Sequence, residues 1–148
     1  MLLSKSCWSS AGEHSLMPTQ RKVNNILIVD DDDNDRVLTK RVLQELFPVA
    51  NLFTCTDGHQ AIECCKEKIY DVVFMDLNMP GIGGIETIMQ IRNFGYKNAI
   101  YILTSGNCDQ ERELCQQIDC NGYFQKTTNT QQLEKLLCEL VNLSIEKL

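Results

Sequence analysis

The chain has 148 residues, 43% of them apolar, which suits one domain with a single sizeable core and is too short for two ordinary domains. Its formal net charge is −6, and it lacks the Lys and Arg clusters that neutralise nucleic-acid phosphates. No apolar run approaches the roughly 18 residues that span a bilayer, so we expect neither nucleic-acid nor membrane partners.

The N-terminal segment, MLLSKSCWSSAGEHSLMPTQRK, is made mostly of small and polar residues. It lacks the apolar middle of a secretory signal, and its composition is typical of an unfolded terminus. We therefore expect a disordered leader at residues 1–22 and one domain at residues 23–148.

The first half of this domain alternates strand-like and helix-like segments. ILIVD, at 26–30, is a short continuous apolar run, which is typical of a strand covered on both faces. Residues 34–47 have apolar side chains at helical spacing. Residues 51–55 then predict a second strand, and residues 57–68 predict a helix with an aspartate cap.

The second half continues the alternation. YDVVFMD, at 70–76, is another buried strand, and a turn with three glycines follows it. The next helix, at 85–95, is expected to have on one stripe Ile85, Ile88, Met89 and Arg92. The remaining elements are a buried strand at 98–105, a weakly apolar helix at 109–118, a brief strand at 122–126 and an amphipathic helix at 130–148.

Five successive strand–helix units predict an α/β fold, a doubly wound sheet of five parallel strands with helices on both faces. Eight cysteines are spread along it, none in a C-x-x-C pair, so a zinc site is not favoured. Most lie among apolar residues, where a free thiol acts as a small hydrophobic group, and this suits a reduced, cytoplasmic setting. A redox role for the adjacent pair Cys64 and Cys65 is the alternative.

Chemically active side chains recur where the predicted strands end. The first strand ends at Asp30, within a run of four aspartates, and the third ends at Asp76. The fourth ends at Thr104 and the fifth at Lys126. Because ligands gather at the carboxyl ends of parallel strands, one edge of the sheet is expected to collect carboxylates, hydroxyls and an ammonium.

This collection suits phosphoryl transfer to a carboxylate with the help of Mg²⁺. Oxygen ligands fit Mg²⁺, and the cation offsets the repulsion between neighbouring carboxylates. An aspartate that attacks phosphorus forms an acyl phosphate, while a lysine and a hydroxyl can bind the phosphoryl oxygens.

Each feature also has a plainer interpretation. The aspartate run can be a solvated turn in which Asp33 or Asn34 caps the next helix. Asp30 and Asp32 resemble the D-x-D that follows the first strand of haloacid-dehalogenase-type phosphatases, although those enzymes usually carry a cap insertion for which this chain has little room. A small phosphohydrolase with an aspartate nucleophile therefore stays an alternative.

Taken together, ILIVDD, VVFMDLNMPGIGG, ILTS and GYFQK resemble, over roughly residues 24–147, the receiver domain of two-component response regulators, in particular the stand-alone, chemotaxis-regulator-like kind. The resemblance implies a flavodoxin-like (βα)5 sheet with strand order 2-1-3-4-5. It implies a phosphoacceptor signalling domain that catalyses only its own phosphotransfer and dephosphorylation, not an enzyme acting on other substrates. The expected partners are a histidine kinase or phosphotransfer protein and a downstream protein target, because we expect no output domain after the last helix.

The resemblance also implies a role for individual residues. Asp76 matches the phosphoacceptor and a ligand of Mg²⁺. Asp31 matches a direct metal ligand, and Asp30 one that acts through water. Asn78 matches the position whose backbone carbonyl completes the metal site.

Three further residues match the phosphoryl-binding and switching positions. Thr104 matches the hydroxyl that turns toward the phosphoryl group, and Lys126 matches the lysine that binds it. Tyr123 matches the aromatic residue that swings inward when that hydroxyl moves.

Two positions depart from the family pattern. Thr127 follows Lys126 where the family usually has a proline joined by a cis bond. Since a non-proline cis bond costs about 2.5–4 kcal/mol, we expect either a trans bond with a displaced lysine or a strained loop. Gly83 replaces a usual acidic residue near the site. The missing proline keeps open a second alternative, a receiver-like interaction module that no longer accepts phosphate.

Overall fold

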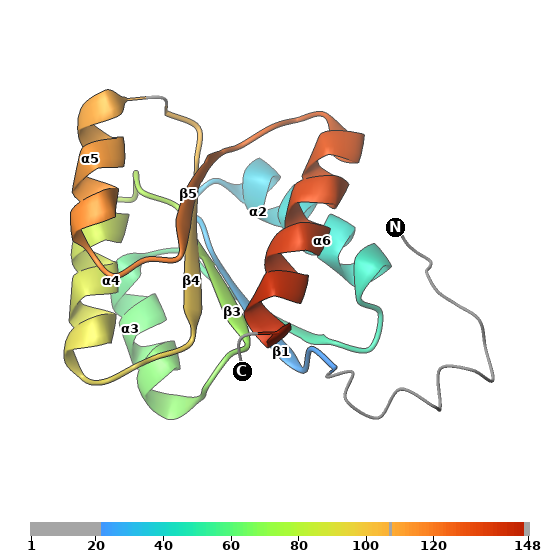
Figure 1. Ribbon diagram of the computed structural model, residues 1–148, viewed down its shortest axis with the longest axis horizontal. Coiled ribbons are helices and arrows are strands. Elements are labelled where there is room, and N and C mark those ends of the chain that lie inside the picture. The colour runs from blue at the N-terminus through green and yellow to red at the C-terminus, as the bar shows by residue number, and fades with distance from the viewer. Residues whose placement is uncertain (1–21, 107, 147–148) are drawn as a thin grey trace.

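A computed structural model describes residues 22–106 and 108–146, in which five parallel strands form one sheet between two layers of helices (Figure 1). The predicted strand order is confirmed, since the neighbours run β2-β1-β3-β4-β5. The strands are β1 (Asn25–Val29), β2 (Asn51–Cys55), β3 (Val72–Met75), β4 (Ala99–Thr104) and β5 (Gly122–Gln125). The helices are α2 (Asp33–Leu46), α3 (Gly58–Glu67), α4 (Gly84–Asn93), α5 (Asp109–Gln117) and α6 (Thr130–Glu146). The predicted leader, apart from Lys22, lies outside the described residues.

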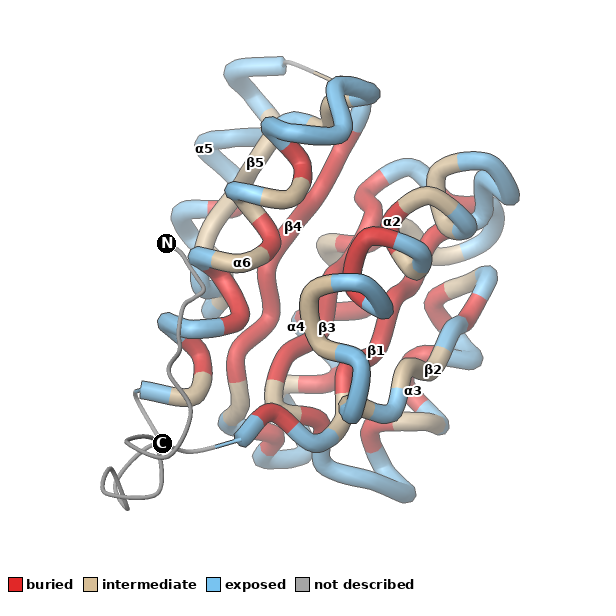
Figure 2. The backbone as a smooth tube through the Cα atoms, turned by 90° about the vertical axis from the view of Figure 1, so that its right-hand side faces the viewer, coloured by how far each residue is buried: buried red, intermediate tan, exposed pale blue. Residues whose placement is uncertain are grey.

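The sheet separates two apolar cores. Helices α3, α4 and α5 cover one face and α2 and α6 the other (Figure 1). Along β1 the side chains alternate, so that Leu27 packs in the first core and Ile26 and Ile28 in the second. Strands β3 and β4 are buried along their whole length (Figure 2), as the continuous apolar runs predicted. Within residues 22–106 and 108–146, no helix is long and apolar enough to cross a bilayer.

Two helix caps show how local sequence sets the ends of helices. The predicted aspartate cap of α3 is confirmed, because the Asp57 carboxylate accepts a hydrogen bond from the Gln60 N–H. At α2 the suggested caps were wrong, since Asp32 caps the helix by accepting from the Asp35 N–H at 2.9 Å. Asp33 and Asn34 already lie inside the helix.

The predicted stripe of α4 was partly wrong. Ile88 is buried as expected, but Met89 is 55% exposed, and Ile91 is buried in its place. The buried stripe begins at Gly84, one residue before the predicted start, because this glycine lies against the end of β3. The close backbone contact, which apolar spacing does not encode, sets which side of α4 faces the sheet.

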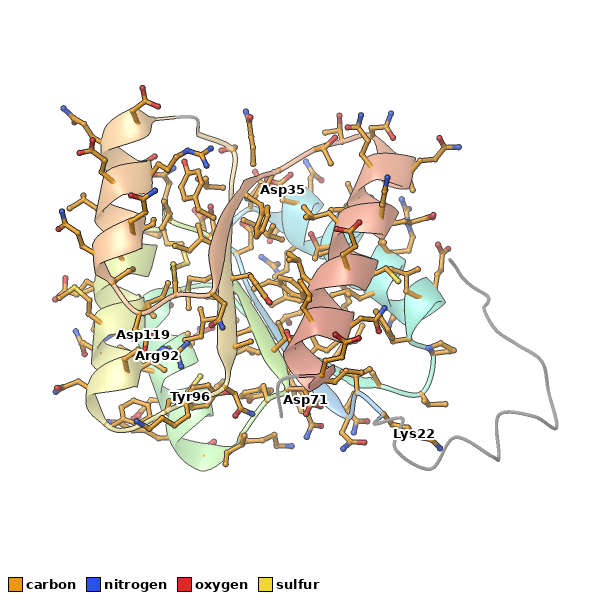
Figure 3. The ribbon with its side chains drawn as sticks, in the orientation of Figure 1. Lys22, Asp35, Asp71, Arg92, Tyr96 and Asp119 are labelled. Atoms are coloured by element: carbon orange, nitrogen blue, oxygen red, sulfur yellow. The ribbon has the colours of Figure 1, made fainter. Side chains whose placement is uncertain are left out.

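Arg92, expected on the apolar stripe, instead joins two loops at the amino-terminal ends of the strands, the one before β4 and the one before β5. Its guanidinium donates hydrogen bonds to the carbonyls of Tyr96, Asn98 and Asp119 at 2.7–2.8 Å. A further bond reaches the Asn121 side chain at 3.1 Å, and that side chain also accepts from the backbone of β4. Figure 3 shows Arg92 beside Asp119, between the lower ends of α4 and α5. Arg92 therefore holds the loops before β4 and β5 together at the amino-terminal edge of the sheet.

Candidate functional site

The carboxyl ends of β1 and β3 place two buried aspartates side by side. Asp30 and Asp76 each follow the last residue of their strand and are only 4% and 5% exposed. The sheet holds their backbones, because the Asp30 N–H donates to the Cys55 carbonyl at 3.1 Å and the Asp76 N–H to the Val29 carbonyl at 2.9 Å. Both carboxylates are thus fixed by strand pairing, not by a flexible loop.

Together with the exposed Asp31, these residues form an acidic cluster. One carboxylate oxygen from each of Asp30, Asp31 and Asp76 lies within 4.8 Å of the other two. Among the described residues, Asp76 Oδ1 is buried without a hydrogen-bond partner. An unsatisfied buried oxygen is costly, and three close carboxylates repel one another. A small, hard divalent cation fits this set of oxygen donors and would relieve both costs.

The surroundings of Asp76 raise its pKa. Burial raises the pKa of this carboxyl to about 7, and the charges of Asp30 and Asp31 add to the rise. The positive charge of Lys126 and a backbone hydrogen bond from Asn78 oppose it. Since burial and like charges favour the protonated form, a divalent cation bound here would favour the ionised carboxylate at neutral pH.

Lys126 lies at the centre of the same cluster, directly after β5. Its ammonium is 2.8 Å from Asp30 Oδ2, 2.9 Å from Asp35 Oδ2 and 3.6 Å from Asp76 Oδ1. Burial would lower the pKa of Lys126, but its bonds to Asp30 and Asp35 and the charge of Asp76 raise the pKa above its ordinary value. The lysine therefore stays charged at the site.

The departure at Thr127 does not remove the lysine from the site. No peptide bond in the described part of the chain is cis, so the bond between Lys126 and Thr127 is trans, but the displaced lysine that was expected with a trans bond is not found. The lysine still reaches Asp76, because its own N–H donates to the Thr104 carbonyl at 2.7 Å and extends the pairing of β4 and β5. Thr127 itself accepts from the Asn129 N–H in the turn before α6.

Sequence reasoning missed Asp35, which supplies one of the three carboxylates around Lys126. Figure 3 places Asp35 at the opposite end of the sheet from Arg92 and Tyr96, the end at which Lys126 binds it. The helical spacing of α2 could have indicated that Asp35 points toward the sheet. Asp35 lies four residues before Thr39, which is buried on the inner side of α2.

Thr104 and Tyr123 both contact Gly106. Thr104 is fully buried, and its hydroxyl oxygen accepts from the Gly106 N–H at 3.3 Å. The half-buried Tyr123 donates its hydroxyl to the Gly106 carbonyl at 3.4 Å, and the Arg112 guanidinium lies 4.6 Å from its ring centroid. A movement of Thr104 can therefore reach Tyr123 through one residue.

The turn after β3 completes the site. Asn78 is exposed there, with its side-chain nitrogen near Gly106. Gly81 has φ +81°, a conformation that favours glycine. In the described residues, Asp30, Asp31, Asp76 and Lys126 come together, whereas the side chains of Thr104 and Asn78 make no hydrogen bond to Asp76.

Residues 26–138 match the model of the response regulator receiver domain family. Response regulator UvrY of Escherichia coli K12 is 29% identical over 109 residues, which are 74% of this chain and 50% of UvrY. The chain thus spans about half the length of this curated relative.

Solved structures share the fold. The phosphorylated cyanobacterial phytochrome response regulator RcpA matches with a TM-score of 0.76 and 19% identity, over 85% of this chain and 96% of that chain. The Mn²⁺-bound form of response regulator Rcp1 matches with a TM-score of 0.69 and 22% identity, over 79% of this chain and 91% of that chain.

Proposed function

Since the chain belongs to the response regulator receiver domain family, whose members are signalling domains, we propose that Asp76 accepts a phosphoryl group from a histidine kinase or phosphotransfer protein. One observation carries the proposal. The buried, unpartnered Oδ1 of Asp76 lies 3.6 Å from the Lys126 ammonium, beside two further carboxylates. An oxygen placed in this way can form a bond to phosphorus while a neighbouring cation binds the phosphoryl oxygens.

The cation in this proposal is Mg²⁺, and the donors present fit it. Asp31 and Asp76 would bind it directly, Asp30 through water and Asn78 through its backbone carbonyl. When bound, Mg²⁺ neutralises the carboxylates and the charge that develops on the phosphoryl oxygens. The Mn²⁺-bound form of Rcp1 supports a divalent ion in a related fold.

The proposed transfer uses groups that strand pairing already holds in place. An Asp76 oxygen forms the bond to phosphorus as the bond between phosphorus and the donor breaks. Lys126 supplies a positive charge to one phosphoryl oxygen, and the Thr104 hydroxyl turns to donate to another. Because Thr104 and Tyr123 share Gly106 as a partner, this turn would be transmitted to Tyr123.

Signalling in this proposal is a shift in population between two arrangements of β4, α5, β5 and α6. Helix α5 suits a movable element, because Cys115 is its one buried residue. A downstream protein would read the change by direct contact. The proposed setting is the cytoplasm, where thiols stay reduced, and the cysteines of the described residues are free.

The two alternative functions have less support. The D-x-D reading needs a chemical role for Asp32, whereas the exposed Asp32 carboxylate caps α2 and lies outside the acidic cluster. An interaction module without phosphate chemistry would have no use for a buried Asp76 beside Lys126. Burying these charges costs stability, so such a module would gain by replacing them with apolar residues.

A thermal melt with cation tests the proposed site. Mg²⁺ at ten times its Kd should stabilise the chain by about 1.4 kcal/mol, and beryllofluoride, a phosphoryl mimic, should add a further rise in Tm. Asp31→Asn removes one oxygen charge from the cluster and should abolish most of the Mg²⁺ effect.

The matched control is Asp33→Asn, which removes a charge from the same aspartate run but outside the cluster. This variant should keep the full response to Mg²⁺. A wild-type chain whose Tm is unmoved by both Mg²⁺ and beryllofluoride would favour the interaction module over the phosphoacceptor.

Asp35→Asn should speed phosphorylation of the chain. The substitution frees Lys126 from one of its two close carboxylates, so the ammonium can move toward Asp76. Loss of one negative charge next to the site is worth roughly 1 kcal/mol, or about a fivefold higher rate of labelling by acetyl phosphate. Asp33→Asn again serves as control, because Asp33 pairs with Arg36 on the same helix. Equal acceleration in both variants would show a general charge effect and not one acting through Lys126.

A further inference from the structure

Three free thiols gather around β2 and α3, and the proposed phosphoryl transfer uses none of them. Cys55 ends β2, and Cys64 and Cys65 lie on α3. The hypothesis drawn from sequence paired the two adjacent cysteines. In the structure, the sulfur that faces Cys64 is that of Cys55, with the two Sγ atoms 3.2 Å apart.

Helix geometry explains this pairing. Consecutive residues on an α-helix point about 100° apart, so Cys64 and Cys65 face different neighbours. Cys65 is buried in the first core. Cys64 lies toward the edge strand β2, where it packs at the border of the first core.

We propose that Cys55 and Cys64 form a reversible disulfide when the chain meets a hydroperoxide. A disulfide has its sulfurs about 2.05 Å apart, so the two atoms need to approach by only about 1.1 Å. Cys55 is the last residue of an edge strand, which leaves β2 room for this small shift. Proximity also favours reaction between these two thiols over reaction with any thiol of another chain.

The two sulfurs differ in access, which sets the order of reaction. Cys55 is 2% exposed, and burial, followed by its contact with Cys64, raises its pKa well above the ordinary range. A protonated, buried thiol reacts poorly with peroxide. Cys64 is half-buried, so in this proposal peroxide reacts first with Cys64.

The chemistry balances in two steps. The Cys64 sulfur attacks the peroxide, the O–O bond breaks, and Cys64 becomes a sulfenic acid while water leaves, or an alcohol if the peroxide is organic. The Cys55 sulfur then attacks the Cys64 sulfur, the S–O bond breaks, and the hydroxide leaves with the Cys55 proton as water. Overall the two thiols lose two electrons and two protons, and the peroxide gains them.

The cross-link would join α3 to the backbone that holds Asp30. The Cys55 carbonyl accepts the hydrogen bond from the Asp30 N–H at 3.1 Å, and Cys55 lies opposite Val29 in the strand register. The modification site is therefore one hydrogen bond away from the acidic cluster, although its formation does not depend on phosphorylation.

Peptide mapping by mass spectrometry tests the proposal on the full chain. Reduced protein is treated with hydrogen peroxide in native buffer, remaining thiols are blocked with N-ethylmaleimide in denaturant, and the digest is analysed without reduction. The expected main product is a pair of peptides joined through Cys55 and Cys64, lighter by two hydrogen atoms and separated again by dithiothreitol. Protein oxidised in denaturant should give mixed pairs, because the native distance is lost.

Variants test the order of reaction. Cys55→Ser should accumulate sulfenic acid at Cys64, trapped by dimedone, and Cys64→Ser should give neither the cross-link nor sulfenic acid at Cys55. Cys138→Ser, which removes a thiol on α6, should leave the cross-link unchanged. The proposal is overturned if wild-type Cys64 stays reduced under peroxide that oxidises the exposed Cys108, or if most cross-links join other cysteines. The wild-type map decides this even if a serine variant fails to fold.

Discussion

Asp76→Ala is expected to abolish labelling of the chain by acetyl phosphate while leaving the fold intact. The substitution removes the one oxygen of the cluster that is buried, unpartnered and next to the Lys126 ammonium. Loss of a nucleophile that forms the covalent bond lowers the rate on the order of 10³-fold or more. Stability should not fall much, because the variant also removes a buried charge that Asp30 and Asp31 repel.

The measurement is the gain of one phosphoryl group in the intact mass, with circular dichroism to verify the fold. Asp33→Ala is the matched control, since it removes an exposed carboxylate from the aspartate run and should label normally. Persistent labelling of Asp76→Ala at a site stable to acid would contradict the assignment, because an acyl phosphate on a carboxylate is labile.

Gly84→Ala is expected to destabilise the domain severely. A Cβ at this position would lie 2.3 Å from the Asp76 carbonyl oxygen and 2.9 Å from Leu77 Cα, and both are backbone atoms that cannot rotate away. The Gly84 N–H also donates to the Leu77 carbonyl at 2.9 Å, so the turn cannot open without losing that bond. Overpacking of this kind should cost about 3 kcal/mol or more.

Urea denaturation of Gly84→Ala beside Gly83→Ala measures this effect. At Gly83 a Cβ would lie 3.2 Å from the Leu77 carbonyl, and φ is −76°, which alanine adopts readily. We expect a loss below about 1 kcal/mol there, typical of a glycine replaced at a helix cap. Labelling by acetyl phosphate should also fall in Gly84→Ala, since the displaced backbone carries Asp76. Equal midpoints for the two variants would show that α4 can move away at little cost.

Much of the site was predictable because parallel strands deliver their last residues to one edge. Buried apolar runs located the ends of β1 and β3, and with them Asp30 and Asp76, without knowledge of any side-chain contact. Lys126 followed from the same logic at β5. The alternation of residues along a strand predicts which face of the sheet a side chain points to. For a residue directly at the end of a strand, this is enough to place it near the site.

The contacts that sequence did not predict depend on distances between elements. Asp35 binds Lys126, which lies 91 residues later in the chain. Cys55 contacts Cys64 because of the distance at which α3 packs against β2. The phase of α4 depends on how closely Gly84 approaches β3, and the role of Arg92 depends on where three carbonyls converge. Periodicity within a short stretch of sequence predicts single helices and strands, but it does not predict the distances between them.

The hydrogen bond from Arg92 to Asp119 holds the carboxyl-terminal end of α5 in place. It binds the loop after α5 through the Asp119 carbonyl at 2.7 Å, whereas near the other end of α5 the Arg112 guanidinium contacts the Tyr123 ring, and the Thr104 and Tyr123 hydroxyls form longer bonds to Gly106, at 3.3 and 3.4 Å. A helix held more firmly at one end than at the other would respond by tilting about the held end. Under the proposed switch, a rearrangement at Thr104 would tilt α5, with the largest displacement at Asp109 and the smallest near Gln117, so that a partner would sense the orientation of the helix.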